Sequence, residues 1–438
     1  MTAFSGLILA AIAPCVGGDT RVSDDPIRVS GPALLLEAPD DTTALFASCS
    51  YTRSRGTQLM LGYMHERMSD VADEQFVRLS DDNGRTWSEP LDESAAADGP
   101  HAAHPADPAP SGHLNPFAPE RLPISLSRSR PEGMDPDVPQ TYWTQTGMTY
   151  AVMRDDGRPL VPAQPLIARG QEFSATHPIA GLEIGRNQVY AVHRPLFLDR
   201  ERVVVPLELS ALDDTGAVYD PHGWDFSQVV VLVGTRRRGG YEWWSSAPLR
   251  VDAFTESTRG MSEPTLGKLA DGSLIMLMRG SNSFRPELPG RKWISRSTDG
   301  GRTWTHPVQW TFEDGTSFYS PSSISHLRRH SNGRLYWFGN VCRENPDGNS
   351  PRHPLVAGEV DRRSGLLKQA TLTVVADRSP EQSPAIQFSN FSLYEDRVTR
   401  EFVLDVTHYH PSGKPNRRGT GEAWTGNVYR YRIALTPQ

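Results

Sequence analysis

Hydrophobic and polar positions alternate along most of this chain in short runs, which is the two-residue period of β-strands. No stretch sustains the longer period of an amphipathic helix. Tight turns such as Asp271-Gly272 and Asn332-Gly333 separate neighbouring runs, as a β-hairpin requires. The pattern therefore predicts an all-β protein with a closing strand at Asn427–Leu435. The predicted hairpins are Leu45–Ser50 with Gln58–Met64, Val189–Leu198 with Val203–Leu209, Thr265–Leu269 with Leu274–Met278, Ser322–Leu327 with Leu335–Phe338, and Phe391–Glu395 with Glu401–Val406.

Two stretches, Ser80–Trp87 and Ser297–Trp304, share the pattern S-x-D-x-G-x-T-W, and each follows a strand-like run. An Asp and a Gly two positions apart describe a tight turn, because the carboxylate accepts backbone N–H bonds and Gly takes a positive φ. The Ser and Thr can bond across the mouth of the turn, and the Trp can pack beneath it. Asp82 and Asp299 are therefore expected to be structural.

This pattern resembles the Asp-box, the turn repeated on the blades of sialidase-like β-propellers. Degenerate copies of the turn begin near residues 153, 236 and 361, so that successive copies lie about 70 residues apart on average. That spacing divides 438 residues into about six repeats. The resemblance implies one domain over residues 19–438, a six-bladed propeller of four-stranded antiparallel blades. The proline-rich stretch of about 101–140 is expected to be a surface-loop insertion and not part of a blade.

Composition and charge bear on the partner, the state of the cysteines and the cellular location. The 45 Lys and Arg against 52 Asp and Glu give a net charge of −7, which argues against nucleic acid as the main partner. The three cysteines match neither a disulfide framework nor a zinc site, so Cys49 and Cys342 are expected to be reduced, buried thiols. The apolar run within residues 1–18 predicts a signal segment and a secreted or periplasmic protein. That run is too short for a membrane span, and it has no preceding basic residue, so a cytoplasmic location stays open.

The segment around Arg67 and Asp73 is the first candidate for chemistry. In sialidases the corresponding place holds an arginine followed six residues later by the acid/base aspartate, and these two residues have that spacing. An Asp that holds a proton near neutral pH can protonate a glycosidic oxygen. His65 and Asp70 are its neighbours. The alternative is a solvated loop with an ordinary ion pair.

Three further segments supply cations. Glu263-Pro264 followed by Arg279 resembles the superfamily element in which the Glu activates a tyrosine and the Arg holds the substrate carboxylate. Arg352, in an R-x-P-L segment, resembles another arginine of that cluster, and a guanidinium fork meets a carboxylate with two bonds. His193 and Arg194 belong to the expected inner strand of the third blade and are candidates for a further cation at the site. Each of these residues has a structural alternative, such as a strand-end Arg or a solvent-facing pair.

Two features depart from the family pattern. The arginine of its R-I-P element has no counterpart in the first expected strand. The position of the nucleophilic tyrosine reads Gln387-Phe388-Ser389-Asn390-Phe391, without a phenol. Tyr319 is nominated to pair with Glu263, and Tyr394 and Tyr409 are the other candidates.

The resemblance implies an exo-acting glycoside hydrolase on an acidic glycan, with exo-α-sialidase as the model activity. The catalytic residues would be Asp73, Glu263 and Tyr319, and an acidic oligosaccharide or glycoconjugate would be the partner. No cofactor or metal is predicted, although an axial calcium ion is conceivable, and the protein is expected to be a monomer or small oligomer. A uronate-directed polysaccharide lyase and a non-catalytic glycan-binding propeller remain as alternatives. For a lyase, candidate proton carriers are His65, His193, His408 and Tyr409.

Overall fold

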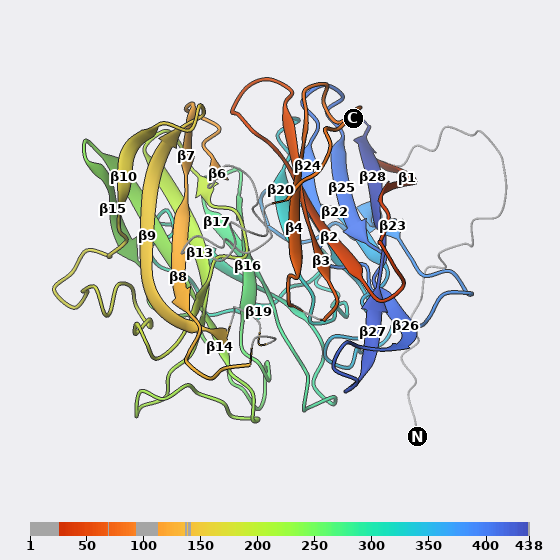
Figure 1. Cartoon of the computed structure of the whole chain (residues 1–438). Coiled ribbons are helices and arrows are strands. Elements are labelled where there is room, and N and C mark those ends of the chain that lie inside the picture. The colour runs from red at the N-terminus through yellow and green to blue at the C-terminus, as the bar shows by residue number, and fades with distance from the viewer. Residues whose placement is uncertain (1–25, 69, 93–112, 136–137, 139–141, 437–438) are drawn as a thin grey trace.

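The computed structural model describes residues 26–68, 70–92, 113–135, 138 and 142–436. Its strands form six antiparallel sheets arranged as blades around a ring, and one additional two-stranded hairpin (Figure 1). The six-bladed β-propeller implied by the resemblance and by the repeat spacing is therefore confirmed, as are the five hairpins at the starts of blades. The expected signal segment, residues 1–18, lies outside the described residues.

Each of the first five blades is built in chain order, and the first strands of neighbouring blades contact one another, as β2 does with β24 and β16 with β20. From first to fourth position, blade 1 has β2 (Ala44–Tyr51), β3 (Leu59–Glu66), β4 (Glu74–Ser80) and β5 (Leu91–Asp92), and blade 2 has β6 (His113–Leu114), β7 (Glu120–Leu122) with β8 (Ile124–Ser129), β9 (Thr144–Arg154) and β10 (Pro159–Pro165). Blade 3 has β11 (Val189–Tyr190) with β12 (Leu196–Phe197), β13 (Arg202–Ser210), β14 (Ser227–Arg237) and β15 (Gly240–Ser245), and blade 4 has β16 (Ser262–Lys268), β17 (Leu274–Arg279), β18 (Lys292–Ser297) and β19 (Val308–Gln309). Blade 5 has β20 (His326–Arg329), β21 (Leu335–Asn340), β22 (Leu355–Val360) and β23 (Thr373–Ala376), and blade 6 has β24 (Ser392–Glu395), β25 (Phe402–Thr407), β28 (Val428–Leu435) and β1 (Ile27–Leu36). One turn of 3₁₀ helix, η3 (Gln369–Thr371), precedes β23.

Blade 2 corrects one prediction. The expectation of a surface loop over about 101–140 is wrong for residues 113–129, which form β6, β7 and β8 of this blade. Strands β7 and β8 both pair with β9 and are separated by Pro123, which has no N–H to offer a ladder. The short, proline-interrupted strands carry too little alternation to be recognised in the sequence.

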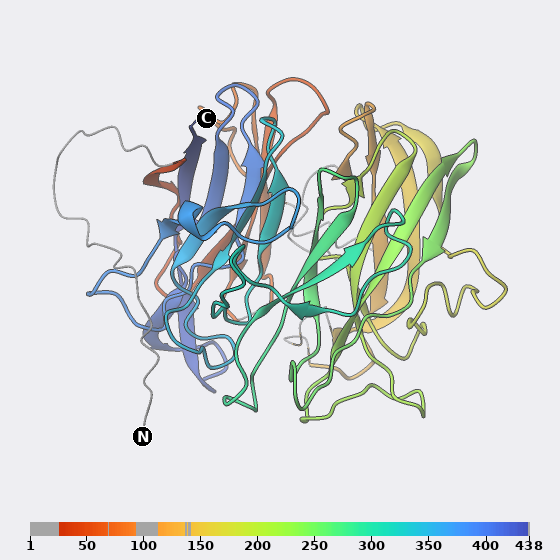
Figure 2. The same cartoon turned by 180° about the vertical axis from the view of Figure 1, so that it is seen from behind.

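The ring is closed by the two ends of the described chain. Strand β1 pairs with β28, with Ile27 opposite Leu435 and Leu36 opposite Val428, so the N-terminal strand becomes the outer strand of blade 6. Figure 2 shows this red strand beside the blue strands of the last blade. The closing strand predicted at Asn427–Leu435 is thus confirmed. Between β25 and β28 the chain adds a separate hairpin, β26 (His410–Pro415) and β27 (Glu422–Thr425), called the blade 6 hairpin below.

The two S-x-D-x-G-x-T-W stretches form equivalent turns between the third and fourth strands of blades 1 and 4. In the first turn, the Asp82 carboxylate accepts bonds from the Ser80 hydroxyl at 2.8 Å and from the Thr86 amide at 2.9 Å. In the second, Asp299 accepts the corresponding bonds from Ser297 at 2.8 Å and Thr303 at 3.0 Å. Both carboxylates are thus used inside their own turns.

The core consists of apolar side chains packed between neighbouring blades. Between blades 4 and 5, for example, the fully buried rings of Trp310 and Trp337 meet edge to face with centroids 5.3 Å apart. Cys49 and Cys342 are buried and free, as predicted, and burial raises the pKa of each thiol to about 12. Within the described ranges, no helix has the length and apolar character that crossing a bilayer requires.

Candidate functional site

The loops that join second to third strands lie on one face of the ring, called the loop face below. Their described residues for blades 1 to 6 are 67–68 and 70–73; 130–135, 138 and 142–143; 211–226; 280–291; 341–354; and 408–427. The antiparallel order of every blade places these loops at the end opposite the S-x-D-x-G-x-T-W turns, which join third to fourth strands. Arg67, Asp73, Arg279 and Arg352, all predicted from the sequence, belong to this face. Glu263 joins them because its strand, β16, begins where β17 ends, with Ser262 opposite Arg279.

Glu263 and Arg279 form the central ion pair. An Oε1–Nη1 distance of 2.6 Å joins them, and Arg279 also donates from Nη2 to Asn349 Oδ1 at 3.1 Å. Glu263 has φ +47°, a strained conformation for a residue with a side chain, at the bulge between Ser262 and Thr265. Its other oxygen, Oε2, is buried and has no hydrogen-bond partner among the described residues. Strand β16 therefore presents a carboxylate that is only half paired.

Two ionisable neighbours complete this part of the site. Burial, reinforced by the nearby Glu263 carboxylate, raises the pKa of Glu208 to about 7. Burial also lowers the pKa of Lys292 to about 7, although Glu263 opposes this effect. The Lys292 ammonium donates to the carbonyls of Pro321, at 3.2 Å, and Ser323. Glu263 itself keeps a pKa below its ordinary value because Arg279 and other nearby cations outweigh the opposing effect of burial. The site thus holds one ionised carboxylate beside one that can retain a proton near neutral pH.

Arg352 is a cation that bonds to no carboxylate in the described part of the chain. Its guanidinium donates to Gln387 Oε1 at 3.0 Å, to the Ser389 hydroxyl at 3.4 Å and to the Ser322 carbonyl at 2.8 Å, all neutral acceptors. Its Nε is buried without any partner among the described residues. Burial first, and then the neighbouring Arg279, lowers the pKa of Arg352 to about 10, so the side chain remains charged at neutral pH. An anion is the ligand that such a group lacks.

The segment from His65 to Glu74 behaves differently from the expected substrate contact. Asp73 accepts the Arg67 amide at 2.9 Å, while the two side chains are 3.9 Å apart. The other Asp73 oxygen binds Arg417 of the blade 6 hairpin. His65 Nδ1 lies 2.7 Å from Glu74 Oε2, so it is also paired inside the segment. Both oxygens of Asp73 and the His65 ring therefore have protein partners.

Asp70 occupies a different position in the same segment. It is exposed and has φ +63°, again a strained conformation for a residue with a side chain. Its charge counteracts the fall in the pKa of Arg352, and it strengthens the effect of burial in raising the pKa of Glu66. Asp70 is thus the carboxylate of blade 1 that is electrostatically coupled to the unpaired arginine.

Three other predicted residues form no ion pair with Glu263, Arg279 or Arg352, although His193 adjoins Glu263 closely enough for each to act on the pKa of the other. His193 is buried against the His326 ring at 4.8 Å, and burial lowers its pKa to about 3, so it is neutral and supplies no cation. Arg194 is exposed and forms no hydrogen bond or ion pair with the described residues. Tyr319 lies beneath the Arg291 guanidinium, 4.4 Å from ring centroid to Cζ. The expected Glu263–Tyr319 pair is not formed, because Glu263 bonds to Arg279 instead.

The sequence analysis missed Glu208, Lys292 and Arg259. Lys292 begins β18 and lies opposite Arg279, but this register exists only in the assembled sheet. Arg259 lies four residues before Glu263, and its guanidinium stacks over the Trp224 ring at 5.1 Å. Burial and Arg279 lower the pKa of Arg259, while Asp225 opposes that change. No signal in the sequence places these groups beside Glu263, because they come from different strands and blades.

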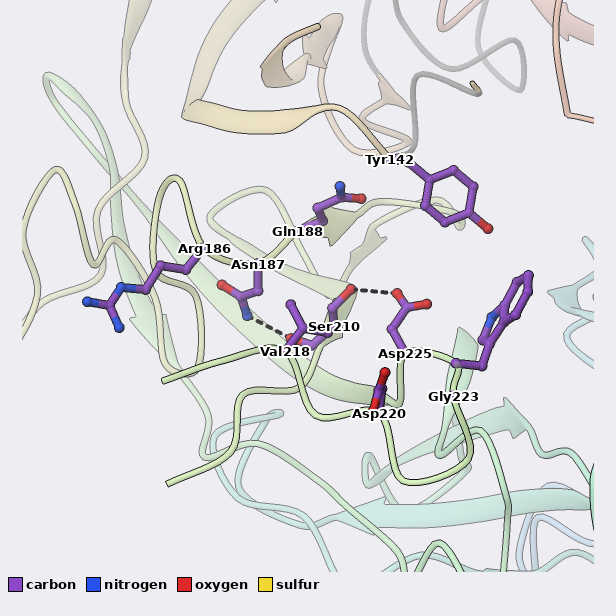
Figure 3. Close-up of a pocket in the computed structure, with 10 residues that line it drawn as sticks. Tyr142, Arg186, Asn187, Gln188, Ser210, Val218, Asp220, Gly223 and Asp225 are labelled. Atoms are coloured by element: carbon purple, nitrogen blue, oxygen red, sulfur yellow. Dashed lines mark hydrogen bonds between the residues drawn. The ribbon is translucent and has the colours of Figure 1, made fainter. Parts of the chain in front are cut away.

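A cavity of about 350 Å³ adjoins these residues on blade 3. Figure 3 shows the side chains that line it, among them Tyr142, Ser210 and Asp225. No group of three or more His, Cys, Asp or Glu side chains in the described part of the chain is placed to hold a metal ion. The site can therefore be described by its guanidinium, carboxylate and aromatic groups.

No protein-family model matches the sequence, and no curated protein matches it either. Among solved structures, a protein of unknown function from Dyadobacter fermentans is 13% identical with a TM-score of 0.55, covering 94% of this chain and 100% of that one. A Hadza microbial sialidase is 14% identical with a TM-score of 0.52, covering 92% and 68%. A variant of the NanB sialidase from Streptococcus pneumoniae is 12% identical with a TM-score of 0.50, covering 95% and 71%. At these identities the likeness concerns the fold, which is that of the sialidase-like propellers.

Proposed function

We propose that this protein is a glycoside hydrolase that releases a carboxylate-bearing sugar from a glycan, in the manner of an exo-sialidase. The observation that carries the proposal is Arg352, a charged guanidinium with neutral partners only and a buried, unpartnered Nε. A carboxylate would supply the missing anion through paired, charge-assisted bonds. Arg279 lies close enough to act on the pKa of Arg352, so the two guanidinium groups would share that carboxylate. Solved sialidases of the same fold are consistent with this assignment.

Hydrolysis also needs a proton donor near the glycosidic oxygen. Two carboxyl groups of blade 1 are candidates, and their surroundings differ. Asp73 binds Arg417 and accepts the Arg67 amide, so protein groups hold both of its oxygens in place. Asp70 is exposed and electrostatically coupled to Arg352. We therefore assign the acid/base role to Asp70 and a positioning role to Asp73.

The second half of the reaction needs a base or a nucleophile. No tyrosine bonds to Glu263 among the described residues, so the tyrosine expected from the resemblance has no support in this geometry. Glu263 is itself ionised and keeps one unpartnered oxygen. We assign it the role of activating the attacking water or attacking directly, which are the two roles open to the second carboxylate of a glycosidase.

A uronate lyase is the second candidate, because Tyr409 lies close enough to Arg352 to act on the pKa of its guanidinium. In a lyase the arginines would neutralise the uronate carboxylate, and a phenol could move the proton. Release of a product with a carbon–carbon double bond, detected by ultraviolet absorbance, would favour this reaction over hydrolysis.

The test is a panel of fluorogenic glycosides that contains a sialoside, a uronide and a neutral galactoside. We expect cleavage of an acidic member only, with kcat/KM reduced about 150-fold in Arg352→Met and by a similar factor in Asp70→Asn. Arg237→Met, an exposed arginine on the outer side of blade 3, is the matched control and should leave kcat/KM unchanged. Absence of turnover on every acidic glycoside, together with absence of an unsaturated product from polyuronates, would refute an enzymatic role.

A further inference from the structure

A second cavity, called the blade 1 cavity below, lies against the first blade. Its volume is about 420 Å³, within the range of small-molecule sites. Two parts of the chain enclose it: the end of β1 with the segment that follows, residues 34–39, and one face of blade 1 formed by β2, β3 and β4. None of the residues that line it lines the cavity on blade 3 or belongs to the Glu263–Arg279 pair.

One wall of the blade 1 cavity is aliphatic. Leu34, Leu36 and Leu45 line it, and the last two also belong to the apolar core between blades 6 and 1. Leu34, two residues before Leu36, remains 54% exposed. Covering such a side chain contributes about 25 cal/mol for each Å² of apolar surface removed from water. A ligand with a hydrocarbon body is therefore the kind of occupant that this wall favours.

Two hydrogen-bond donors in the lining have no partner among the described residues. Tyr63 on β3 lies opposite Phe76 on β4, and Arg78 lies two residues beyond Phe76, so Tyr63 and Arg78 share one face of the sheet. The Phe76 ring stacks on the Tyr63 ring, with centroids 5.2 Å apart, and restrains it. The Arg78 guanidinium forms no hydrogen bond or ion pair with the described chain, and its Nε is buried. The Tyr63 hydroxyl also bonds to no described residue.

The charge of Arg78 is not neutralised by the other residues that line the cavity. Glu37, the carboxylate in this lining, is exposed and forms no ion pair with Arg78. His65 also lines the cavity, but its Nδ1 lies 2.7 Å from Glu74 Oε2 and is engaged there. A half-buried cation without a counterion is unfavourable, and an anion that enters the cavity supplies the missing charge. Because a guanidinium meets a carboxylate with two charge-assisted bonds, a carboxylate is the head group that fits best.

We propose that the blade 1 cavity binds an amphiphilic carboxylate, a molecule with the chemistry of a short fatty acid. Its carboxylate binds Arg78 and Tyr63, and its hydrocarbon body lies against Leu34 and Leu36. The ligand contacts β1 and blade 1 together, so it joins the strand that closes the ring to the first blade. The assignment is independent of the proposed hydrolase function, because it uses none of the residues that would hold or cleave the sugar.

Three small probes separate the head group from the hydrocarbon body: hexanoate, 1-hexanol, which lacks the charge, and acetate, which lacks the chain. Saturation-transfer NMR measures the binding of each. We expect the wild type to bind hexanoate about tenfold more tightly than either of the other two. Arg78→Met should weaken hexanoate binding about tenfold and leave 1-hexanol binding unchanged. Arg85→Met, in the turn that follows β4 and outside the cavity, is the matched control and should change neither.

A second pair of variants tests the aliphatic wall. Leu34→Ser should weaken hexanoate and 1-hexanol binding alike, by about threefold. Leu91→Ser is its control, because Leu91 is 58% exposed on β5 and lies outside the cavity, and it should weaken neither. Since Arg78 bonds to no described residue, Arg78→Met should keep the wild-type Tm within about 1 °C, which separates loss of the site from loss of the fold.

Four outcomes would overturn the inference. The wild type fails to bind hexanoate, or it binds acetate as tightly as hexanoate, which would contradict the role of the aliphatic wall. Hexanoate binding survives in Arg78→Met and is lost in Arg352→Met, which would place the anion at the arginine cluster. Sedimentation shows a dimer that Leu34→Ser abolishes, which would assign the surface to a second copy of this chain. Failure of the glycoside panel changes none of these results, so the two proposals fail separately.

Discussion

Two arginines of this propeller, Arg430 and Arg352, differ in whether a carboxylate pairs with the guanidinium, and the consequence can be measured. Arg430 forms a two-bond ion pair with Asp405, with Nε–Oδ1 at 2.7 Å and Nη2–Oδ2 at 2.8 Å, and the Asp405 side chain is 0% exposed. Arg352 has three neutral acceptors and no carboxylate. If Arg352 is kept for an anionic ligand and Arg430 for the fold, replacing each by Met will separate activity from stability.

The expected magnitudes follow from these partners. Arg430→Met leaves Asp405 buried and uncompensated, which costs about 3–5 kcal/mol of unfolding free energy. Arg352→Met loses hydrogen bonds to neutral acceptors, but it also removes the several kcal/mol needed to dehydrate a lone cation, so the net change is within about 1 kcal/mol. An unfolding entropy of about 2.1 cal/mol/K per residue makes 1 kcal/mol equal to about 1 °C in a chain of 438 residues. Arg430→Met should therefore lower Tm by about 3–5 °C, and Arg352→Met by no more than about 1 °C.

The assay is calorimetric unfolding of the three proteins, together with kcat/KM on the acidic glycoside that the wild type cleaves. Loss of the charged contacts to a substrate carboxylate should cost Arg352→Met about 3 kcal/mol of transition-state binding, or roughly 150-fold in kcat/KM. A Tm that falls as far in Arg352→Met as in Arg430→Met would show that Arg352 is structural. Retained kcat/KM in Arg352→Met would refute the anion-binding role directly.

Three further predictions concern titratable groups and the blade 6 hairpin. The folded pKa of Glu208 is raised to about 7, so the protonated carboxyl contributes to stability; this contribution is complete below the unfolded pKa and is lost as pH rises toward 7. In urea titrations at pH 8, Glu208→Gln should therefore be more stable than wild type by about 1–3 kcal/mol. An unchanged pH profile of the unfolding free energy would contradict this prediction. Despite partial burial, hydrogen bonds from Thr303 and its neighbours lower the pKa of Asp299 to about 2. The ionised carboxylate therefore contributes to stability above the unfolded pKa, and this contribution is lost as pH falls toward 2. Asp299→Asn should reduce the dependence of the unfolding free energy on pH in that range, and an unchanged dependence would count against the prediction. Lys414, Arg417 and Arg418 tie the blade 6 hairpin to Asp41, Asp73 and Asp135. Hydrogen exchange in residues 410–425 should therefore speed up in about 1 M salt and in Arg417→Met, whereas exchange that ignores salt would mean that packing holds the hairpin.

Local patterns explain why most of the architecture could be predicted. A hairpin such as β16–β17 is encoded within about fifteen residues by alternation and an Asp-Gly turn, and the two S-x-D-x-G-x-T-W turns give the repeat. The prediction missed the first strands of blade 2 because β6 and β7 contain two and three residues, too few to show the two-residue period of a strand. Strand β8, which follows Pro123, lies in a stretch whose prolines were interpreted as a loop.

The site was predictable only in part, because its chemistry depends on contacts between blades. The Glu263-Pro264 and Arg279 segments were recognised by their resemblance, and register then explains their pairing. Arg352 was also recognised by its R-x-P-L segment, but its partners come from two other segments, so only the assembled ring shows that they are all neutral. His193 was considered as a cation, yet burial against His326 keeps it neutral, and burial is a property of the assembled ring.

The geometry of the candidate site also depends on β1, the strand that closes the ring of blades. Glu263 lies on β16 of blade 4, whereas Arg352 and Asp70 lie on loops of blades 5 and 1, so their mutual influence requires the blades to keep their places around the axis. Blade 6 separates blade 5 from blade 1, and its outer strand comes from the start of the described chain. The pairing of β1 with β28 runs from Ile27 to Leu36, and the Ile27 side chain packs in the core shared by blades 5 and 6. Loss of β1 would expose the edge of β28 and loosen blade 6 against its neighbours. The coupling between Asp70 and Arg352 therefore depends on a strand to which neither of them belongs.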